Sequence, residues 1–446
     1  MKQHRILSAL LVLILLLGLA ACGTTTTPTP AGEPETTAET PADTASDGTD
    51  VTATLTYWDT SDYADLESNR ILATAIEKFN EKYPNVTIDV VGKGRVEDLY
   101  SAMSIAFGAG NGPDLFWANV GEVMSDYVKN GYLMDLTDLA AELKWSDVYY
   151  TSALNNQQTL WNGIYAAPKA QKVLGIYYSK AIYEQFGFEV PTSIEEFKAQ
   201  CDELAAAGIT PIGNAGKYAA CTNRWFDGFL DVNAGTELHD ALLNGTASIN
   251  CDAVVQSFKD MAELTQYFQT GYLSQEESET CMALVSGGVC FTFDGSWVYY
   301  DIQNAGASVE DYGMFVFPAS DAPRADTYGD GVFANADTKY PELVKYFLEC
   351  YSDADCYKAA FESTGAITVA RYDVIDQNGL DSLNKDILGC LNAAGGSYMP
   401  SNEMAWPAQL SDELLEYIDQ IALGVITPEE AAANLDATAS AIGFYK

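Results

Sequence analysis

The middle of the chain reads Tyr165-Ala166-Ala167-Pro168, then Val173-Leu174-Gly175-Ile176-Tyr177-Tyr178-Ser179-Lys180, then Phe186-Gly187-Phe188-Glu189-Val190-Pro191-Thr192-Ser193-Ile194-Glu195-Glu196-Phe197. The second segment is rich in β-branched and aromatic residues and predicts a strand. In the third, Thr192 and Glu195 have the spacing of a capping box. The apolar face of the helix that follows consists of Ile194, Phe197, Cys201 and Leu204. Because this pattern ends at Gly208 and Ile209-Thr210-Pro211-Ile212 begins another strand, the local order is strand, helix, capped helix, strand.

The alternation of strand and helix extends toward the N-terminus. We expect a helix from Arg70 to Tyr83, ended by Pro84, and strands at Thr54–Tyr57, Val86–Val91 and Asp114–Trp117. Such alternation is typical of α/β proteins with a largely parallel sheet covered by helices. Ligands of these sheets bind beyond the carboxyl ends of the strands. Trp58-Asp59 and Ala118-Asn119 are therefore candidate binding positions.

The N-terminus has the features of an export signal. Lys2 and Arg5 precede an apolar run from Ile6 to Leu19, and the sequence continues as Leu19-Ala20-Ala21-Cys22. This end resembles the bacterial lipobox, which predicts removal of residues 1–21 and acylation of Cys22, with palmitate for example. The alternative is an ordinary signal peptide with a chance cysteine. Residues 22–50 consist mostly of Thr, Pro, Ala and acidic residues, so we expect a disordered linker. The predicted location is the outer face of the cell membrane, through the lipid anchor.

Length and charge limit the classes of partner. The chain has 446 residues, of which 48% are hydrophobic, and this length suggests two or three domains. The formal net charge is -40 and the isoelectric point is about 4.1. A surface of this kind repels phosphate backbones, so we expect no nucleic-acid partner. Many of the carboxylates can simply form a solvated face. Neutral or cationic ligands are compatible with this field.

Histidine and cysteine usage excludes several kinds of site. His239 is the only histidine outside the signal segment, so catalytic triads based on histidine and histidine-rich zinc sites are not available. The eight cysteines beyond Cys22 form no Cys-x-x-Cys pair, which argues against structural zinc. They can form disulfides or remain buried thiols, and the position of Cys201 on an apolar helix face favours thiols. We expect no catalytic residues, no metal and no cofactor.

Several motifs follow one another in the order of a known family. They are Gly112-Pro113-Asp114-Leu115-Phe116, Asn130-Gly131-Tyr132-Leu133-Met134-Asp135-Leu136, Tyr165-Ala166-Ala167-Pro168, Tyr177-Tyr178-Ser179-Lys180, Pro191 to Phe197, Gly208-Ile209-Thr210-Pro211-Ile212, Gly288 to Trp297 and Thr427-Pro428-Glu429-Glu430-Ala431. The chain resembles the extracellular solute-binding lipoproteins of ABC sugar importers (family 1), similar to maltodextrin- and multiple-sugar-binding proteins. It departs from the family pattern at Ala166, Ser179 and Ile194, where capping and burial are unaffected. The resemblance spans nearly all of the folded body.

The resemblance implies a two-lobed, type II periplasmic-binding-protein-like fold of the α/β class. Hinge strands would link two helix-covered lobes that close on a ligand. The first lobe would comprise residues 51–165 and 319–364, and the second residues 166–318 and 365–446. We expect the chain to cross between them near Tyr165–Pro168, Phe315–Pro318 and Thr364–Ala366.

Candidate ligand-binding residues combine aromatic rings with polar groups. Aromatic rings cover the apolar faces of sugars, and carboxylates and amides bind sugar hydroxyls. The candidates are Trp58, Asp59, Asn119, Trp225, Asp294, Ser296, Trp297, Tyr328 and Trp406. Trp225 and Trp406 are expected in polar loops, after Thr222-Asn223-Arg224 and Ser401-Asn402-Glu403, and Tyr328 in a loop beside Gly329-Asp330-Gly331. Asp59 and Asp294 have a second interpretation as caps of the helices that follow. Trp117, Trp145 and Trp161 are expected in the core.

These expectations describe a monomeric, lipid-anchored binding protein that delivers a mono- or oligosaccharide to the permease subunits of an ABC importer. Two alternatives remain open. The solute can be another neutral or cationic molecule, such as a polyol or a polyamine. An exported glycoside hydrolase would need only two carboxylates about 5 to 10 Å apart.

Overall fold

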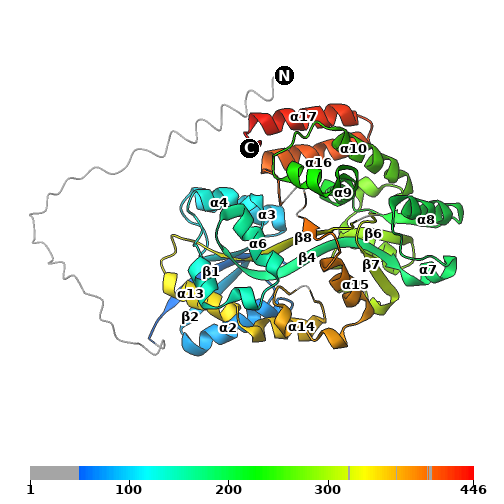
Figure 1. Cartoon of the computed structure of the whole chain (residues 1–446). Helices are drawn as coiled ribbons and strands as arrows, with labels where there is room; N and C mark the ends of the chain where they lie inside the picture. The colour runs from blue at the N-terminus through cyan, green and yellow to red at the C-terminus, as the bar shows by residue number, and fades with distance from the viewer. Residues whose placement is uncertain (1–49, 320–321, 368, 399, 401–403) are drawn as a thin grey trace, which may run out of the picture. The chain divides into compact units, whose positions relative to one another are not determined.

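The computed structural model describes residues 50–319, 322–367, 369–398, 400 and 404–446, all within the unit Asp47–Lys446 (Figure 1). The predicted signal peptide, Cys22 and nearly all of the predicted linker lie outside these residues, as does Ser401-Asn402-Glu403. Within the described part of the chain, no helix has both the length and the hydropathy that a membrane span requires.

The strands form one mixed sheet. They are β1 (Ala53–Asp59), β2 (Val86–Gly92), β3 (Leu115–Asn119), β4 (Ala166–Ser179), β5 (Thr210–Gly213), β6 (Val289–Gly295), β7 (Tyr312–Phe315), β8 (Ala325–Ala334) and β9 (Ser397–Tyr398). The order is β2-β1-β3-β8-β4-β6-β5, with β7 beside β4 and β9 beside β8. β1 is parallel to β2 and β3, and β5 to β6, whereas β8 is antiparallel to β3 and β4, and β4 to β6 and β7. The expectation of a largely parallel sheet is therefore wrong, because β4 and β8 are long strands in the middle of the sheet that lie outside its β-α-β units.

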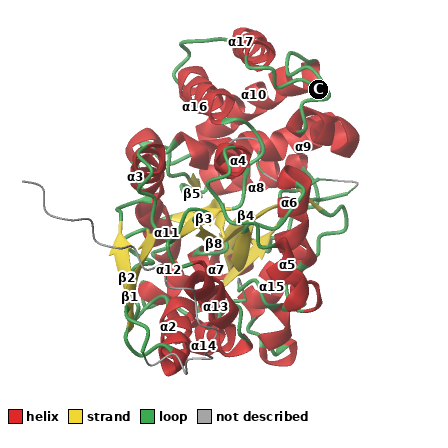
Figure 2. Ribbon diagram, turned by 90° about the vertical axis from the view of Figure 1, so that its left-hand side faces the viewer, coloured by secondary structure: helices red, strands yellow, loops and turns green. Residues whose placement is uncertain are grey.

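Helices cover both faces of this sheet. Those longer than one 3-10 turn are α2 (Arg70–Lys82), α3 (Val96–Gly108), α4 (Ser125–Lys129), α5 (Thr137–Glu142), α6 (Thr151–Trp161), α7 (Lys180–Phe186), α8 (Ile194–Ala206), α9 (Ala219–Leu243), α10 (Asp252–Leu264), α11 (Glu277–Val285), α12 (Val298–Asn304), α13 (Pro341–Tyr351), α14 (Ala354–Thr364), α15 (Ser382–Leu391), α16 (Ala408–Ala422) and α17 (Pro428–Ala441). Figures 1 and 2 show α2, α13 and α14 on one side of the strands and α3, α4 and α6 on the other.

β4 belongs to both ends of the sheet. From Ala166 to Val173 it pairs with β8, and from Leu174 onward it pairs with β6 and β7. The register shifts between Pro168 and Ala170, so one residue is inserted there. Such a bulge changes the direction of the side chain at that point. The side chain concerned is that of Lys169.

Separate hydrophobic clusters form at the two ends of the sheet. One large cluster includes Leu55, Phe79 and Phe347 and packs between the β1 end and α2 and α13. Another includes Phe197 and Phe258 and packs between the β6 end and α8, α9, α10, α16 and α17. Aliphatic and aromatic side chains of this size each contribute about 1.5–3 kcal/mol on full burial. Each end of the sheet therefore has a core of its own.

The local predictions around α8 are confirmed, except for the cap. Phe197, Cys201 and Leu204 are buried on one helix face, as predicted. The N-cap is Ser193, whose Oγ accepts a hydrogen bond from the Glu196 backbone at 3.2 Å. The Glu196 carboxylate accepts from the backbone N and Oγ1 of Thr192, at 2.8 and 2.9 Å. The helix starts one residue later than predicted, so Ser193 rather than Thr192 is the N-cap, and Glu196 rather than Glu195 makes the side-chain contact with Thr192.

The cysteines of the described residues are free thiols. Cys201 is completely buried on α8, and Cys251 is the one that is partly exposed. This agrees with the interpretation of these residues as small apolar side chains of the core.

Candidate functional site

One face of the central strands brings several polar and aromatic residues together. In the register of β3 against β8, Asn119 lies opposite Asp330, and Trp117 is two residues before Asn119. In the register of β8 against β4, Tyr328 lies opposite Lys172. Side chains alternate between the two faces of a strand, and directly opposed residues share a face. All five side chains are therefore on the same side of the sheet.

Asp330 is the centre of this group. Its Oδ2 accepts hydrogen bonds from Trp117 Nε1 at 3.0 Å and lies 3.1 Å from Lys172 Nζ. Its Oδ1 accepts from the backbone N of Ala170 at 2.8 Å. The residue is buried, so these three donors replace the water that the carboxylate has lost. Asp330 thus fixes the relative positions of β3, β8 and β4.

Asp59, at the carboxyl end of β1, is a second buried carboxyl group. Its Oδ1 accepts from the backbone N of Thr60 at 2.8 Å, and its Oδ2 from Tyr57 Oη at 3.3 Å. Burial raises the pKa of Asp59 to about 6, although the nearby charge of Lys169 acts in the opposite direction. The group is therefore able to change its charge within a mildly acidic range of pH.

Lys169 is close enough to both carboxyl groups to interact electrostatically with them. Its Nζ is 3.5 Å from the ring centroid of Tyr63 and 5.9 Å from that of Trp117. Burial lowers the pKa of Lys169, and the charges of Asp59 and Asp330 oppose this effect. The rings of Tyr63 and Trp117 meet edge to face, with centroids 5.5 Å apart. The lysine is thus enclosed by aromatic rings.

A second charged group lies at the carboxyl end of β6. Arg224 Nη1 donates to Asp294 Oδ1 at 2.7 Å, and its Nη2 donates to Glu277 Oε1 at 2.9 Å. Asp294 Oδ1 also accepts from the backbone N of Gly295 at 2.7 Å. Burial raises the pKa of Asp294 to about 7, while the neighbouring Arg224 acts to lower it. Arg224 comes from α9, so this network connects that helix to the sheet.

Trp297 joins the two groups. The Arg224 guanidinium is 5.4 Å from its ring centroid, and Lys172 Nζ is 5.9 Å from the same centroid. The indole packs against Gly295, where an added Cβ would be 2.0 Å from the ring. The half-buried ring therefore lies between a charged group of each end of the sheet. We call the combined set the midline cluster, defined as Asp59, Tyr63, Trp117, Asn119, Lys169, Lys172, Arg224, Asp294, Trp297, Tyr328 and Asp330.

Five of the nine candidate residues fall within this cluster: Asp59, Asn119, Asp294, Trp297 and Tyr328. Tyr328 is on strand β8, so its expected position in a loop is wrong. Ser296 is completely buried and its Oγ accepts from the backbone N of Val173 at 3.4 Å, which makes it a support of the strand. Trp58 lies outside the cluster, with Lys93 Nζ 3.7 Å from its ring centroid.

The rings of Trp225 and Trp406 are buried in the core, although Trp406 lies in the predicted loop before α16. Trp225 lies on α9 rather than in a polar loop, is completely buried, and donates from Nε1 to Asn214 Oδ1 at 3.2 Å. Its ring is covered by Phe197, Phe268, Phe293 and Phe317. Trp406 is 1% exposed and packs near Phe444. Neither ring presents a face to a ligand in this arrangement. Trp117 and Trp145 are buried, as predicted.

The main members that sequence analysis missed are charged residues: Lys169, Lys172, Arg224 and Asp330. Lys169 and Lys172 lie before the predicted strand Val173–Lys180, but the observed strand β4 begins at Ala166 and includes both. Asp330 stands between two glycines, which suggested a loop; in the structure, Gly331 allows the close approach of the Ala167 backbone on β4. Arg224 was expected in a polar loop, whereas it lies on α9, and its partners Asp294 and Glu277 are more than 50 residues away in sequence.

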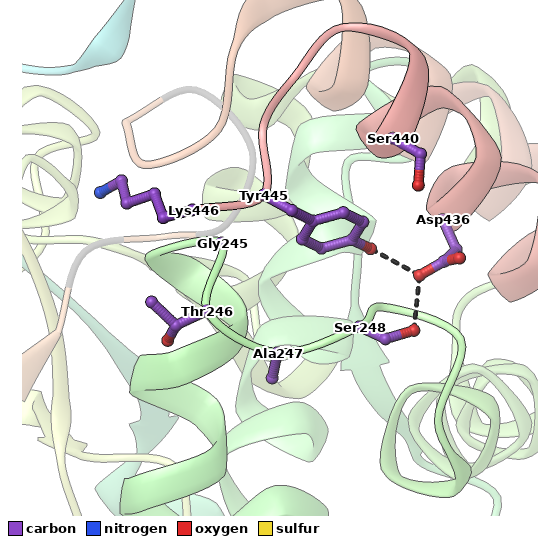
Figure 3. Close-up of a pocket in the computed structure, with 8 residues that line it drawn as sticks. All are labelled: Gly245, Thr246, Ala247, Ser248, Asp436, Ser440, Tyr445 and Lys446. Atoms are coloured by element: carbon purple, nitrogen blue, oxygen red, sulfur yellow. Dashed lines mark hydrogen bonds between the residues drawn. The ribbon is translucent and has the colours of Figure 1, made fainter.

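A separate surface pocket of about 350 Å³ lies between the α9–α10 loop and the C-terminus (Figure 3). Asp436 accepts hydrogen bonds there from Ser248 Oγ at 2.6 Å and from Tyr445 Oη at 2.5 Å. Lys446 donates from its backbone N to Gly245 at 2.9 Å. These contacts hold the C-terminal residues against the α9–α10 loop, and the pocket shares no residue with the midline cluster.

Comparison with known proteins agrees with this architecture. A model of the bacterial extracellular solute-binding protein family matches residues 44–355. A probable sugar-binding periplasmic protein of Mesorhizobium japonicum is 24% identical over 358 residues, covering 77% of this chain and 84% of the relative. The multiple sugar-binding protein of Streptococcus mutans is 22% identical, over 67% of this chain and 72% of its own.

Solved structures share the fold. A chitin oligosaccharide binding protein superposes with a TM-score of 0.79 at 20% identity, covering 87% of this chain and 98% of its own. A bacterial solute receptor described as having an exclusive preference for β-D-galactopyranose gives a TM-score of 0.75 at 18% identity, over 88% and 100% of the two chains. The predicted α/β fold of a periplasmic solute-binding protein is thus confirmed. Since the family model covers well over half of its length, this chain belongs to the bacterial extracellular solute-binding proteins.

Proposed function

We propose that this protein is the substrate-binding component of an ABC importer, which captures a sugar or oligosaccharide outside the cell and delivers it to the membrane permease. Family membership supports the binding role. The names of the relatives, which are probable sugar-binding and multiple sugar-binding proteins, support a carbohydrate as the ligand. In this role the protein binds its ligand and releases it unchanged.

The observation that carries the proposal is the composition of the midline cluster. Trp297, Tyr328 and Tyr63 supply aromatic rings, and buried carboxyl, amide and ammonium groups lie beside them. A sugar ring has apolar C–H faces and a rim of hydroxyl groups, and it needs both kinds of partner at once. The cluster also lies where carboxyl ends of β1, β3 and β6 meet, the usual ligand position in such sheets.

We further propose that the body works as two lobes, residues 51–165 with 319–364 and residues 166–318 with 365–446. The separate hydrophobic clusters at the two ends of the sheet support this division. The chain would cross between the lobes near Tyr165–Pro168, where β4 begins, and near Phe315–Pro318, between β7 and β8. The segment Thr364–Ala366 after α14 would be a third crossing, since Tyr357 of α14 packs in the cluster of the β1 end and Ala366 packs with Tyr177 and Met314. Ligand binding would then close one lobe on the other.

The same proposal includes attachment to the membrane. Removal of residues 1–21 and acylation of Cys22 would leave residues 22–50 as a flexible tether on the outer face of the cell membrane. The support for this is the sequence Leu19-Ala20-Ala21-Cys22. Expression of a Cys22→Ala variant would release the protein from the membrane fraction, and retention of that variant would contradict the anchor.

We also propose that the protein is a monomer. Size-exclusion chromatography with light scattering tests this oligomeric state.

A binding assay combined with a turnover assay tests the function. The purified protein is titrated calorimetrically with N-acetylchitotriose, xylotriose, maltotriose, galactose, sorbitol and spermidine, and each mixture is then analysed for products. We expect saturable heat with a sugar and no new product. Saturation with sorbitol or spermidine alone would favour a polyol or polyamine receptor. Hydrolysis of a bound oligosaccharide would favour a glycoside hydrolase.

A further inference from the structure

Lys169 is buried without a hydrogen-bond partner. It is 8% exposed, and among the described residues no group accepts a hydrogen bond from its Nζ. Two other lysines have partners: Lys172 of the midline cluster pairs with Asp330 at 3.1 Å, and Lys180, outside the cluster, donates to Ser382 Oγ at 2.7 Å. Burial of an ammonium group without hydrogen bonds is costly, and the Tyr63 ring replaces only part of the lost hydration. Burial of Lys169 therefore lowers the stability of the folded protein, and packing alone does not account for a lysine at this position.

Asn119 has a buried hydrogen-bond acceptor that also lacks a partner. Its Oδ1 is buried and has no hydrogen-bond partner among the described residues. Asn119 lies opposite Asp330 on β8, and Asp330 in turn accepts from the backbone of Ala170, the residue after Lys169. The two residues are thus neighbours of Asp330, Asn119 across the β3–β8 pairing and Lys169 next to Ala170, and they supply an unsatisfied acceptor and an unsatisfied donor. Each would gain a hydrogen bond from a group brought in from outside.

The charges around Lys169 and Asn119 indicate the chemistry of the ligand group that would bind them. Lys169 and Lys172 stand beside Trp117, with Nζ atoms 5.9 and 5.3 Å from its ring centroid, and repel a cation. Asp330 accepts a hydrogen bond from the same Trp117 ring, and Asp59 interacts electrostatically with Lys169, so these carboxyl groups repel an anion. A hydroxyl group carries no charge, accepts a hydrogen bond from an ammonium and donates one to an amide oxygen. A ring with several hydroxyls therefore satisfies both groups at once.

We propose that Lys169 and Asn119 form a ligand-anchoring subsite that binds adjacent hydroxyl groups of an uncharged sugar ring; this rests on the proposed function and adds a subsite and a ligand charge to it. Tyr63 covers Lys169 Nζ in the structure and belongs to the turn region that follows β1. The ligand reaches the amine when this ring moves aside. In the ligand-free protein the Tyr63 ring covers the amine, and in the complex the sugar hydroxyl takes its place.

The test compares stability with affinity in two matched variants. Lys169→Met removes the amine and keeps the length of the side chain, and Lys180→Met makes the same change at a satisfied lysine outside the cluster. Thermal unfolding without ligand is measured at pH 5.5, where Asp59 with a pKa of about 6 is mostly uncharged. Calorimetric titration then uses the probes N-acetylchitotriose, xylotriose, galactose, galacturonate and spermidine.

We expect Lys169→Met to keep or raise the melting temperature, because the free protein loses a buried ammonium that has no hydrogen-bond partner. The same variant should bind sugar at least tenfold more weakly, because the hydrogen bond from the ammonium to the ligand is lost. Lys180→Met should lower the melting temperature and leave the affinity unchanged. If Lys169→Met is too unstable, Lys169→Met/Asp59→Asn is compared with Asp59→Asn alone. Asn119→Ala should also weaken binding.

Four other results would overturn the subsite, the uncharged ligand or the proposed function. Unchanged sugar affinity in Lys169→Met overturns the subsite and leaves the proposed function standing. A loss of affinity that merely follows a loss of stability, in both lysine variants, shows a structural role and also overturns it. Tighter binding of galacturonate or spermidine than of any neutral sugar overturns the uncharged ligand. Failure of the wild type to bind any of the sugars overturns the proposed function, and the subsite with it.

Discussion

At the scale of single residues, burial sets the charge of the midline cluster. Asp59 and Asp294 have raised pKa values of about 6 and about 7, and burial is the main cause in both. The chain as a whole has a formal charge of -40, yet the cluster contains three basic side chains among its carboxyl groups. The field around a bound ligand is thus determined by these neighbours rather than by the net charge of the protein.

Asp59 should make stability depend on pH. Its pKa is about 6 in the folded protein, against an ordinary value of 3.8, so the folded state holds the proton more tightly than the unfolded state. The protonated Asp59 carboxyl stabilises the folded state by at most about 3 kcal/mol. This stabilisation is fully present below about pH 4 and is lost as the pH rises through about 6. Asp59→Asn should therefore flatten the fall in melting temperature between pH 4 and 7. An equally steep fall in the variant would contradict this assignment, and the exposed Asp62→Asn serves as control.

Trp297 and Trp225 should respond differently to substitution. Trp297→Ala removes a half-buried ring of the cluster and should weaken sugar binding by roughly tenfold, or about 1–2 kcal/mol. Trp225→Phe alters a ring enclosed by the core, so it should lower stability and leave affinity unchanged. Calorimetric titration and thermal unfolding measure the two effects. Full affinity in Trp297→Ala would remove this residue from the site.

At the scale of secondary structure, the close approach of β4 and β8 is the decisive feature. An added Cβ at Gly331 would lie 2.5 Å from the Ala167 carbonyl oxygen, which is backbone and cannot move independently. At Gly329, two residues earlier on β8, the nearest atom to an added Cβ is Gln171 Oε1 at 3.4 Å. The two glycines of one strand therefore differ in how much room they have.

Gly331→Ala should destabilise the protein by about 1–3 kcal/mol, because the added methyl group separates the two central strands. Gly329→Ala meets only an ordinary contact and should change stability by less than about 1 kcal/mol. Denaturant unfolding of both variants, followed by circular dichroism, gives the comparison. Equal effects of the two substitutions would show that the Ala167 contact is not the cause.

At the scale of the whole folded body, one exposed group links the two ends of the sheet. Arg95, at the start of α3, donates from Nη1 to Tyr218 Oη at 2.6 Å, and Tyr218 donates to Glu276 Oε2 at 2.8 Å. The Arg95 guanidinium also lies 4.2 Å from the Tyr218 ring centroid. Tyr218 precedes α9 and Glu276 precedes α11. In the proposed two-lobe arrangement, this contact joins the lobes.

Tyr218→Phe should lower sugar affinity by up to about fivefold, since exposed charged contacts of this kind contribute about 0.2–1 kcal/mol. The cause would be a less stable closed form, so small-angle scattering should show a larger radius of gyration at subsaturating sugar. The control is Tyr372→Phe, which removes an exposed hydroxyl that donates to the Asp147 carbonyl at 2.8 Å. Wild-type affinity in Tyr218→Phe at low salt would exclude a role in closure.

Much of the local structure could be predicted from the sequence alone. The strands near Thr54, Val86 and Asp114 and the helices near Arg70 and Ile194 are present, because period-two and period-3.6 patterns of apolar residues depend only on neighbours along the chain. Family membership followed from the order of short motifs. Asp59, Asn119, Asp294 and Trp297 were found because residues at the carboxyl ends of strands can be located from the strands themselves.

Tertiary structure decided the rest. The mixed sheet, the burial of Trp225 and Trp406, and the charged partners of the cluster were not predictable. Trp117, Lys172 and Asp330 meet through strand registers that connect residues more than 50 positions apart, and no periodicity along the chain encodes such pairing. The sequence by itself therefore determined the elements and the family, whereas the long-range pairing of β3, β8 and β4 determined which side chains form the midline cluster.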